Sequence, residues 1–179
     1  MLSNLEILIS ENDIQTRVNE LAKQISNDYK EKDLVMLCVL KGGVMFMADL
    51  AKQITVPLVM EFLVVSSYGN DTKSSGKVSV LNDLSGTIKG RDILIVEDII
   101  DTGQTLNYLV QYLNTKEART IKICTLLDKK EQRITNVNVD YIGFTVPNAF
   151  VVGYGLDYQQ YYRNLPYIAV NNMISREES

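Results

Sequence analysis

An apolar run that leads into three carboxylates and a small polar loop most constrains how this chain folds. Residues 93–96 are uninterrupted and mostly β-branched, which is typical of a strand buried on both faces. Glu97 and Asp98 end the run, and Asp101 follows three positions later. Residues 102–105 are small or polar, and leucines at helical spacing come directly after them. In an α/β sheet, this strand–loop–helix order predicts a binding site for a phosphorylated ligand.

The charge and cysteine content narrow the class of protein. The 18 basic and 22 acidic residues give a net charge of −4, so we expect no nucleic-acid partner. The N-terminus lacks the basic lead of a secretory signal, and no apolar run reaches the ~18 residues of a membrane span. Without such a span we expect no membrane partner. Cys38 and Cys124 each lie inside an apolar run, which predicts reduced core residues and a cytoplasmic location.

The sequence of 179 residues contains no histidine. This absence excludes Ser-His-Asp and Cys-His catalysis and any zinc site that needs imidazole. Proton transfer in this chain must therefore depend on carboxylates, lysines or tyrosines.

Two further predicted strands also end in polar residues. Residues 34–40 form an apolar run that ends in Lys41-Gly42-Gly43, where glycine lets backbone N–H groups approach a ligand and lysine suits phosphate. The alternative is a tight turn with a surface lysine. Residues 121–127 end in Asp128-Lys129-Lys130, which is either a ligand contact through lysine or a solvated turn.

Residues 66–77 have no apolar periodicity and are rich in glycine, serine and charge. Such a loop is either disordered or a mobile lid, and Tyr68 favours the lid because its ring could cover a ligand. The runs on either side, residues 58–65 and 78–84, predict strands that form a hairpin with this loop.

The order of the elements predicts a single α/β domain over residues 1–179. A capping pair, Ser10 and Asp13, opens a helix between strands at 7–9 and 34–40. Short strands are expected near the C-terminal end, at the ranges 141–144, 150–154 and 168–170. We therefore expect a parallel central sheet flanked by helices (about 34–145), with a small hood lobe from the N-terminal segment and about 146–179.

Several motifs together resemble a known family. Val96 to Gly103, with Thr105, resembles the phosphoribosyl-diphosphate motif of type I phosphoribosyltransferases. The other motifs are similar to those of bacterial hypoxanthine phosphoribosyltransferases, in order and spacing from about Ile7 to Ile168: Leu40–Gly43, Ser67–Tyr68, Leu127–Lys129 and Phe150–Tyr158. The resemblance implies purine salvage, in which phosphoribosyl diphosphate and hypoxanthine or guanine give IMP or GMP and diphosphate. It also implies a homodimer or homotetramer. A regulator that only binds nucleotide and an enzyme for another base remain alternatives.

The resemblance implies roles at the sugar and the phosphates. Glu97 and Asp98 would hold the ribose hydroxyls and, with Asp157, Mg²⁺. The diphosphate would meet Arg163 and the Lys41–Gly42 turn, where a non-proline cis peptide is expected. The 5′-phosphate would be wrapped by the loop of Thr102, Gly103, Gln104 and Thr105.

The same resemblance implies roles at the base. Asp101 would be the general acid/base at purine N7, and Lys129 would donate to the 6-oxo group. Phe150 would stack on the ring and the Val151 backbone would read its pyrimidine edge, with Asp157 between purine and metal. The lid would close through Ser67 and Tyr68.

Overall fold

The main sheet is parallel with one antiparallel edge strand. The computed structural model describes residues 5–67, 78–81, 84 and 88–171. The strand order is β4-β3-β2-β5-β6-β7, and only the β3–β4 pair is antiparallel. The strands are β2 (Leu34–Leu40), β3 (Leu58–Ser67), β4 (Val78–Val80), β5 (Asp92–Ile100), β6 (Thr120–Asp128) and β7 (Tyr141–Thr145). This arrangement confirms the predicted α/β fold class.

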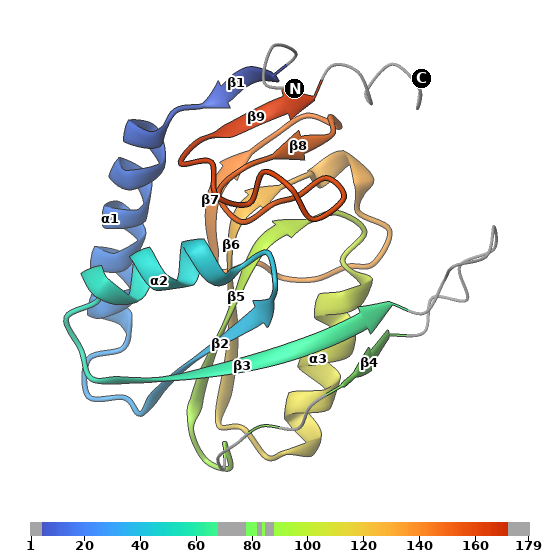
Figure 1. The fold of residues 1–179 in the computed structure, drawn as a ribbon. Coiled ribbons are helices and arrows are strands. Elements are labelled where there is room, and N and C mark those ends of the chain that lie inside the picture. The colour runs from blue at the N-terminus through green and yellow to red at the C-terminus, as the bar shows by residue number, and fades with distance from the viewer. Residues whose placement is uncertain (1–4, 68–77, 82–83, 85–87, 172–179) are drawn as a thin grey trace.

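Helices cover both faces of this sheet (Figure 1). Alternate residues of each central strand point to opposite faces, so β2 contributes Met36 to one apolar cluster and Leu37 to the other. The first cluster contains the buried sides of α1 (Glu11–Asp28) and α2 (Val44–Gln53). The second apolar cluster contains the buried side of α3 (Gln104–Thr115). Both strand faces are buried, which is why these strands read as continuous apolar runs.

The predicted capping pair is present at the start of α1. Ser10 is the N-cap, and its hydroxyl accepts a hydrogen bond from the backbone N–H of Asp13. The hydroxyl in turn donates to the Asp13 carboxylate. This cap satisfies one of the free N–H groups of the first turn and fixes where the chain leaves β1 (Leu5–Ile9).

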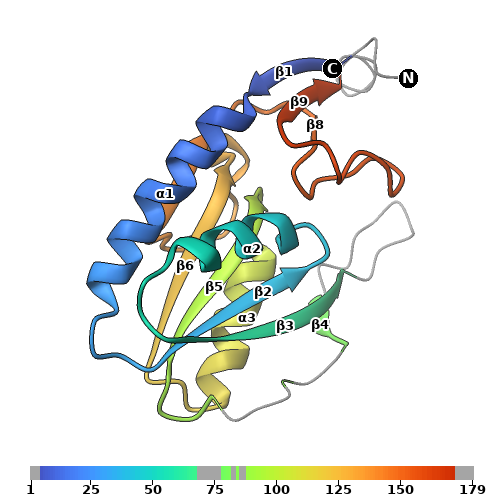
Figure 2. The same ribbon diagram turned by 60° about the vertical axis from the view of Figure 1, so that its left-hand side comes forward.

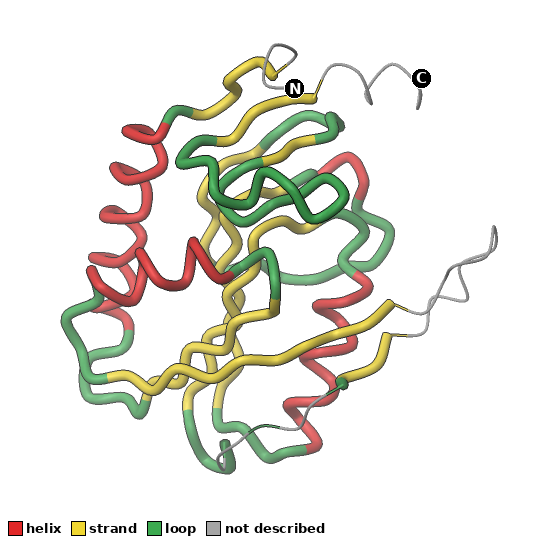
Figure 3. The backbone as a smooth tube through the Cα atoms, in the orientation of Figure 1, coloured by secondary structure: helices red, strands yellow, loops and turns green. Residues whose placement is uncertain are grey.

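A second, antiparallel sheet forms the hood. Its order is β1-β9-β8, with β8 (Val151–Val152) and β9 (Ile168–Asn171) supplied by the other end of the chain. Figure 2 shows this sheet beyond the end of the main sheet where β5 and β6 finish. The segment between β8 and β9 is mostly irregular and lies beside the turn that follows β2 (Figure 3). The carboxyl edge of the main sheet therefore faces the hood.

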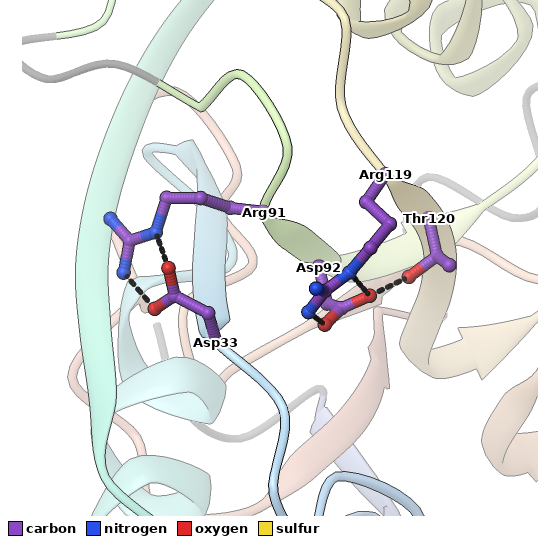
Figure 4. Close-up of polar contacts among 5 residues, drawn as sticks. All are labelled: Asp33, Arg91, Asp92, Arg119 and Thr120. Carbon is purple, nitrogen blue, oxygen red and sulfur yellow. Dashed lines mark hydrogen bonds and ion pairs between the residues drawn. The ribbon is translucent and has the colours of Figure 1, made fainter.

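Ion pairs join the strands at the opposite end of the sheet, where the parallel strands begin (Figure 4). Arg91, just before β5, pairs through two nitrogens with Asp33, just before β2. Asp92 is buried at the start of β5, where it pairs with Arg119 and accepts from the Thr120 hydroxyl. The starts of three neighbouring strands are thereby tied together, away from the hood.

Most predicted strands differ from the structure by one or more residues at an end, and three of these differences have a clear physical meaning. The strand expected at 150–154 contains only Val151–Val152, because Gly153, Tyr154 and Gly155 have φ values of 101°, 48° and 102°, which a strand cannot hold. The strand expected at 78–84 ends at Val80. β5 continues past Val96 to Ile100, because β6 pairs with it along that whole length.

Cys38 and Cys124 are free and buried, as predicted. Burial raises the pKa of the Cys38 thiol to about 12, so this group stays protonated and acts as a small apolar side chain. None of the described helices has the length and apolar character that crossing a bilayer requires.

Candidate active site

Two adjacent buried carboxylates lie near the carboxyl end of β5. Glu97 and Asp98 are 9% and 8% exposed. Burial raises the pKa of Glu97 well above its usual range, and the charge of Asp98 raises it further. Burial also raises the pKa of Asp98. The charge of Arg163 opposes this rise at Asp98. Glu97 Oε2 is buried without a hydrogen-bond partner among the described residues, so this oxygen suits a hydroxyl donor or a cation.

The turn between β2 and α2 rests directly on Asp98. A Cβ atom on Gly42 would lie 1.6 Å from Asp98 Oδ2, so only glycine fits there. Asp98 Oδ1 accepts from the Ile99 N–H at 2.9 Å, which fixes the carboxylate. The expected non-proline cis peptide is present at the Leu40–Lys41 bond, which enters this turn.

The hood contacts the same turn. A Cβ atom on Gly155 would lie 2.0 Å from the Gly42 carbonyl oxygen. The Tyr154 hydroxyl donates to Asp49 of α2 at 2.7 Å, and this bond holds the hood turn against the core. Gly155 O accepts from Arg163 Nη1 at 2.7 Å, so the position of Arg163 depends on the hood turn.

Two of the predicted diphosphate ligands lie close together. Lys41 Nζ and Arg163 Nη2 both donate to Gln160 Oε1, each at 3.4 Å. Gln160 was not predicted, because it lies 119 positions from Lys41 in an exposed turn with no sequence pattern. The neutral Gln160 amide thus brings the ends of the two cationic side chains to one place.

Asp157 forms an ion pair with Arg163 at 2.6 Å. The predicted metal set of Glu97, Asp98 and Asp157 does not form one cluster. Among the residues that the structure describes, no group of three or more carboxylate, cysteine or histidine side chains could hold a metal ion. The chain by itself therefore offers the pair at the end of β5 as its acidic site.

Asp101 and Lys129 form the second charged pair of the site. Lys129 Nζ lies 3.4 Å from Asp101 Oδ1, and the two side chains are 12% and 50% exposed. The Lys129 N–H donates to the Ile100 carbonyl at 3.0 Å, which joins the ends of β5 and β6. The site thus places a hydrogen-bond donor and an acceptor side by side, with the acceptor open to a ligand.

The predicted phosphate loop leads into α3. Gly103 is the N-cap with φ of 82°, and Gln104 is the first residue of the helix. The Thr102 carbonyl accepts from the N–H groups of Ile134 and Thr135, which anchors the outer side of the loop. The Gln104 N–H donates to the Thr102 hydroxyl at 3.4 Å. N–H groups in the first turn of a helix, where Thr105 lies, have no intrahelical acceptor, so this end of α3 favours an anion.

Asp128 is buried, which contradicts the interpretation of residues 128–130 as a solvated turn. Its side chain is 2% exposed and pairs with Arg133. The turn instead leads into a short 3₁₀ helix, η1 (Lys130–Gln132), which brings Arg133 back to the strand ends. Arg133 was not predicted, because a single arginine in a charged loop carries no sequence signal.

Residues 7–159 match the phosphoribosyl transferase domain family. A hypoxanthine-guanine phosphoribosyltransferase of Bacillus subtilis (strain 168) is 53% identical over 165 residues, which are 92% of each chain. This chain belongs to the hypoxanthine-guanine phosphoribosyltransferase family.

Solved structures of related phosphoribosyltransferases have the same fold. A hypoxanthine phosphoribosyltransferase of Staphylococcus aureus superposes with a TM-score of 0.90 at 44% identity, covering 94% of this chain and 92% of that one. The hypoxanthine phosphoribosyltransferase of Trypanosoma cruzi, in a ternary substrates complex, gives 0.87 at 46% identity and covers 92% and 94%.

Phe150 and Val151 of the predicted phosphoribosyltransferase site belong to the hood. The Phe150 ring lies edge-on to Tyr158, with ring centroids 5.8 Å apart. Val151 is buried in β8 and pairs with Val170. Ser67 ends β3, whereas Tyr68 and the rest of the predicted lid, residues 68–77, lie outside the described residues.

Proposed function

We propose that this protein transfers the 5-phosphoribosyl group of phosphoribosyl diphosphate to N9 of hypoxanthine or guanine and releases diphosphate. The Asp101–Lys129 pair beside the phosphate loop carries this proposal. N7 and the 6-oxo group are neighbours on one edge of a 6-oxopurine. A carboxylate and an ammonium 3.4 Å apart match the N7 proton and the 6-oxo oxygen of that edge.

Asp101 handles the proton in the proposed reaction. As N9 bonds to C1′ and the bond from C1′ to the diphosphate oxygen breaks, the purine must lose a proton, and Asp101 accepts it from N7. Half of the Asp101 side chain is exposed, which leaves room for the base. The other acids at this strand end are buried, and the chain has no histidine to compete for this role.

Lys129 selects the base. Its ammonium donates to the 6-oxo oxygen of hypoxanthine or guanine, whereas adenine would present an amino group to it. The Lys129 ammonium and the adenine amino group would then be two donors that face each other. Because Lys129 is only 12% exposed, water could not relieve this mismatch.

Glu97 and Asp98 suit the ribose hydroxyls and Mg²⁺. The buried Oε2 of Glu97 has no donor, and two adjacent buried carboxylates need positive charge or hydroxyl donors near them. Mg²⁺, when bound, would neutralise the leaving diphosphate. Since the described chain offers no third acidic ligand there, oxygens of the substrate and of water would complete the coordination.

Lys41 and Arg163 receive the diphosphate. Both donate to Gln160 Oε1, and Arg163 also pairs with Asp157. A diphosphate at this position would replace the neutral amide as the acceptor for Lys41 and would compete with Asp157 for Arg163. The transition state resembles an oxocarbenium ion, and charge leaves with the diphosphate, so cations fixed there lower the barrier.

A regulator that only binds nucleotide is the rival function. It would not need the Asp101–Lys129 pair, and the net charge of −4 offers no general attraction for nucleic acid. A cytoplasmic location, Mg²⁺ dependence and a homodimer or homotetramer complete the proposal.

Diphosphate release from phosphoribosyl diphosphate, measured with and without hypoxanthine in the presence of Mg²⁺, separates the two functions. We expect release that depends on hypoxanthine and stops when EDTA removes the metal. Tight binding of IMP without any release would support the regulator instead.

A further inference from the structure

Arg133 connects the two strand ends that carry the proposed purine contacts. Its Nη2 pairs with Asp128 Oδ1 at the end of β6, and its Nε donates to the Asp101 carbonyl at 3.2 Å. Asp128 directly precedes Lys129, and Asp101 is the last residue before the phosphate loop. One guanidinium therefore joins the neighbours of both purine-reading side chains.

The aliphatic part of Arg133 also supports the phosphate loop. A Cβ atom on Gly103 would lie 2.9 Å from Arg133 Cδ, so the loop rests on this side chain. The next two residues, Ile134 and Thr135, donate to the Thr102 carbonyl at 3.2 and 3.0 Å. The segment after η1 thus fixes the loop from outside, and Arg133 extends that support to β6.

We propose that Arg133 is a positioning residue that sets the distance between Asp101 and Lys129 and so tunes purine binding and turnover. The proposal rests on the proposed function, because it acts through the two residues assigned to the base. Arg133 itself touches main chain and a buried acid and needs no contact with substrate. Its planar fork can reach both acceptors at once, which an ammonium cannot do.

If Arg133 had only a structural role, its pair with Asp128 would be a buried ion pair like any other in the protein. The chain contains a matched pair for comparison, because Arg119 binds Asp92 at the opposite edge of the same two strands (Figure 4). Asp92 and Asp128 have the same side-chain exposure of 2%. The two pairs differ in that Arg133 also donates to the Asp101 carbonyl and is 17% exposed, whereas Arg119 is 51% exposed.

The test compares Arg133→Lys with Arg119→Lys. Each variant keeps the charge beside its aspartate and loses the fork. For Arg133→Lys we expect a raised KM for hypoxanthine, weaker IMP binding by calorimetry, and kcat/KM lower by about 10²-fold, the cost of misplacing reacting groups by about 1 Å. Arg119→Lys should keep wild-type kinetics. A merely structural role would reduce the active fraction, and so the apparent kcat, and leave KM unchanged.

A second variant covers the case in which Arg133→Lys does not fold. The double substitution Asp128→Asn with Arg133→Met keeps the apolar packing under Gly103 and leaves no buried charge unpaired. It should bind IMP more weakly than wild type, as Arg133→Lys does. Wild-type KM and IMP affinity in a folded Arg133 variant, or equal changes in Arg119→Lys, would overturn the inference. A wild-type protein without hypoxanthine-dependent turnover would overturn both the inference and the proposed function.

Discussion

Three carboxylates at the end of β5 and just past it have different surroundings, and this difference separates their roles. Glu97 and Asp98 are buried, with pKa values raised by burial, and the Gly42 turn packs on Asp98. Asp101 is half exposed and meets Lys129. A group that exchanges protons with the base needs room for it, and Asp101 is the most exposed of the three.

Replacing Asp101 with asparagine tests its role as general acid/base. The amide is nearly isosteric but cannot accept the purine proton, so kcat should fall by ~10²–10⁴-fold. Steady-state kinetics with hypoxanthine measure the loss, and thermal unfolding should give a Tm near that of wild type because the side chain is half exposed. Wild-type kcat in the variant would remove Asp101 from the mechanism.

Replacing Lys129 with alanine tests the reading of the 6-oxo group. The lost donor should raise KM for hypoxanthine by about 10–100-fold, since hydrogen bonds to charged groups contribute about 1.5–3 kcal/mol. KM for phosphoribosyl diphosphate should change much less, because Lys129 faces the base. Lys130→Ala serves as the control, because that neighbouring lysine is exposed. Equal rises in both KM values would contradict a base-specific role.

The residue types of the site could be predicted from the sequence, but their partners could not. Lys41 and Asp101 belong to motifs that are typical of phosphate and purine chemistry, and the family resemblance implied the role of Arg163. Gln160 and Arg133 contact them from 119 and 32 positions away, respectively, and nothing local marks either residue. Contacts between distant segments depend on how the hood and η1 dock, which local patterns do not encode.

At the scale of elements, the site depends on the contact between the hood turn and the β2–α2 turn. A Cβ atom on Gly155 would lie 2.0 Å from the Gly42 carbonyl oxygen, so a side chain on Gly155 would push the turns apart. Buried strands such as Leu34–Leu40 were predicted with correct ends because their apolar runs are uninterrupted. The predicted strand at 150–154 was too long, because its apolar pattern continues through residues whose φ values are positive.

Replacing Gly155 with alanine tests the importance of this contact. The new Cβ would clash with the Gly42 carbonyl and displace Arg163, which donates to Gly155 O. KM for phosphoribosyl diphosphate should therefore rise by about tenfold or more, the loss of a charge-assisted hydrogen bond of about 1.5–3 kcal/mol. Steady-state kinetics at saturating hypoxanthine provide the measurement.

Gly90→Ala is the matched control for backbone strain. Gly90 also has a positive φ, 73°, but a Cβ there meets nothing within 4 Å. This variant should lose about 1–2 kcal/mol of stability to strain and keep wild-type KM values. If both variants raised KM equally, strain and not the contact with Gly42 would explain the effect.

At the scale of the whole molecule, the two ends of the parallel strands have different functions. The amino-terminal edge carries the ion pairs of Figure 4, whereas the carboxyl edge carries the candidate site. This division follows from the parallel sheet, because ligands bind beyond the carboxyl ends of the strands. Substitutions at the first edge should change stability without changing substrate binding.

The Asp92–Arg119 pair makes stability depend on pH at that edge. The hydrogen bond from Arg119 lowers the pKa of Asp92, so the pair stabilises the fold above the unfolded pKa of ~3.9 and loses its effect as pH falls through the folded pKa. Arg119→Met should destabilise the fold at pH 7, but by less than the loss of a fully buried pair, because half of Arg119 is exposed.

Urea unfolding at pH 7 and at about pH 3.5 measures this dependence. The difference in unfolding free energy between wild type and Arg119→Met should shrink at the lower pH, because Asp92 of the variant becomes neutral. Arg91→Met should show little effect at either pH, since its partner Asp33 is solvent-exposed. A difference that does not change with pH would assign the loss to packing and not to charge.

The measurement that tests the central claim most directly is kcat/KM for a panel of bases with phosphoribosyl diphosphate: hypoxanthine, guanine, xanthine and adenine. The Asp101–Lys129 pair predicts turnover of hypoxanthine and guanine, with adenine lower by about 10⁴-fold because its amino group faces the Lys129 ammonium. Xanthine shares the 6-oxo edge, so its rate depends on groups that read C2. Comparable turnover of adenine and hypoxanthine, or turnover of none of the four, would contradict the account.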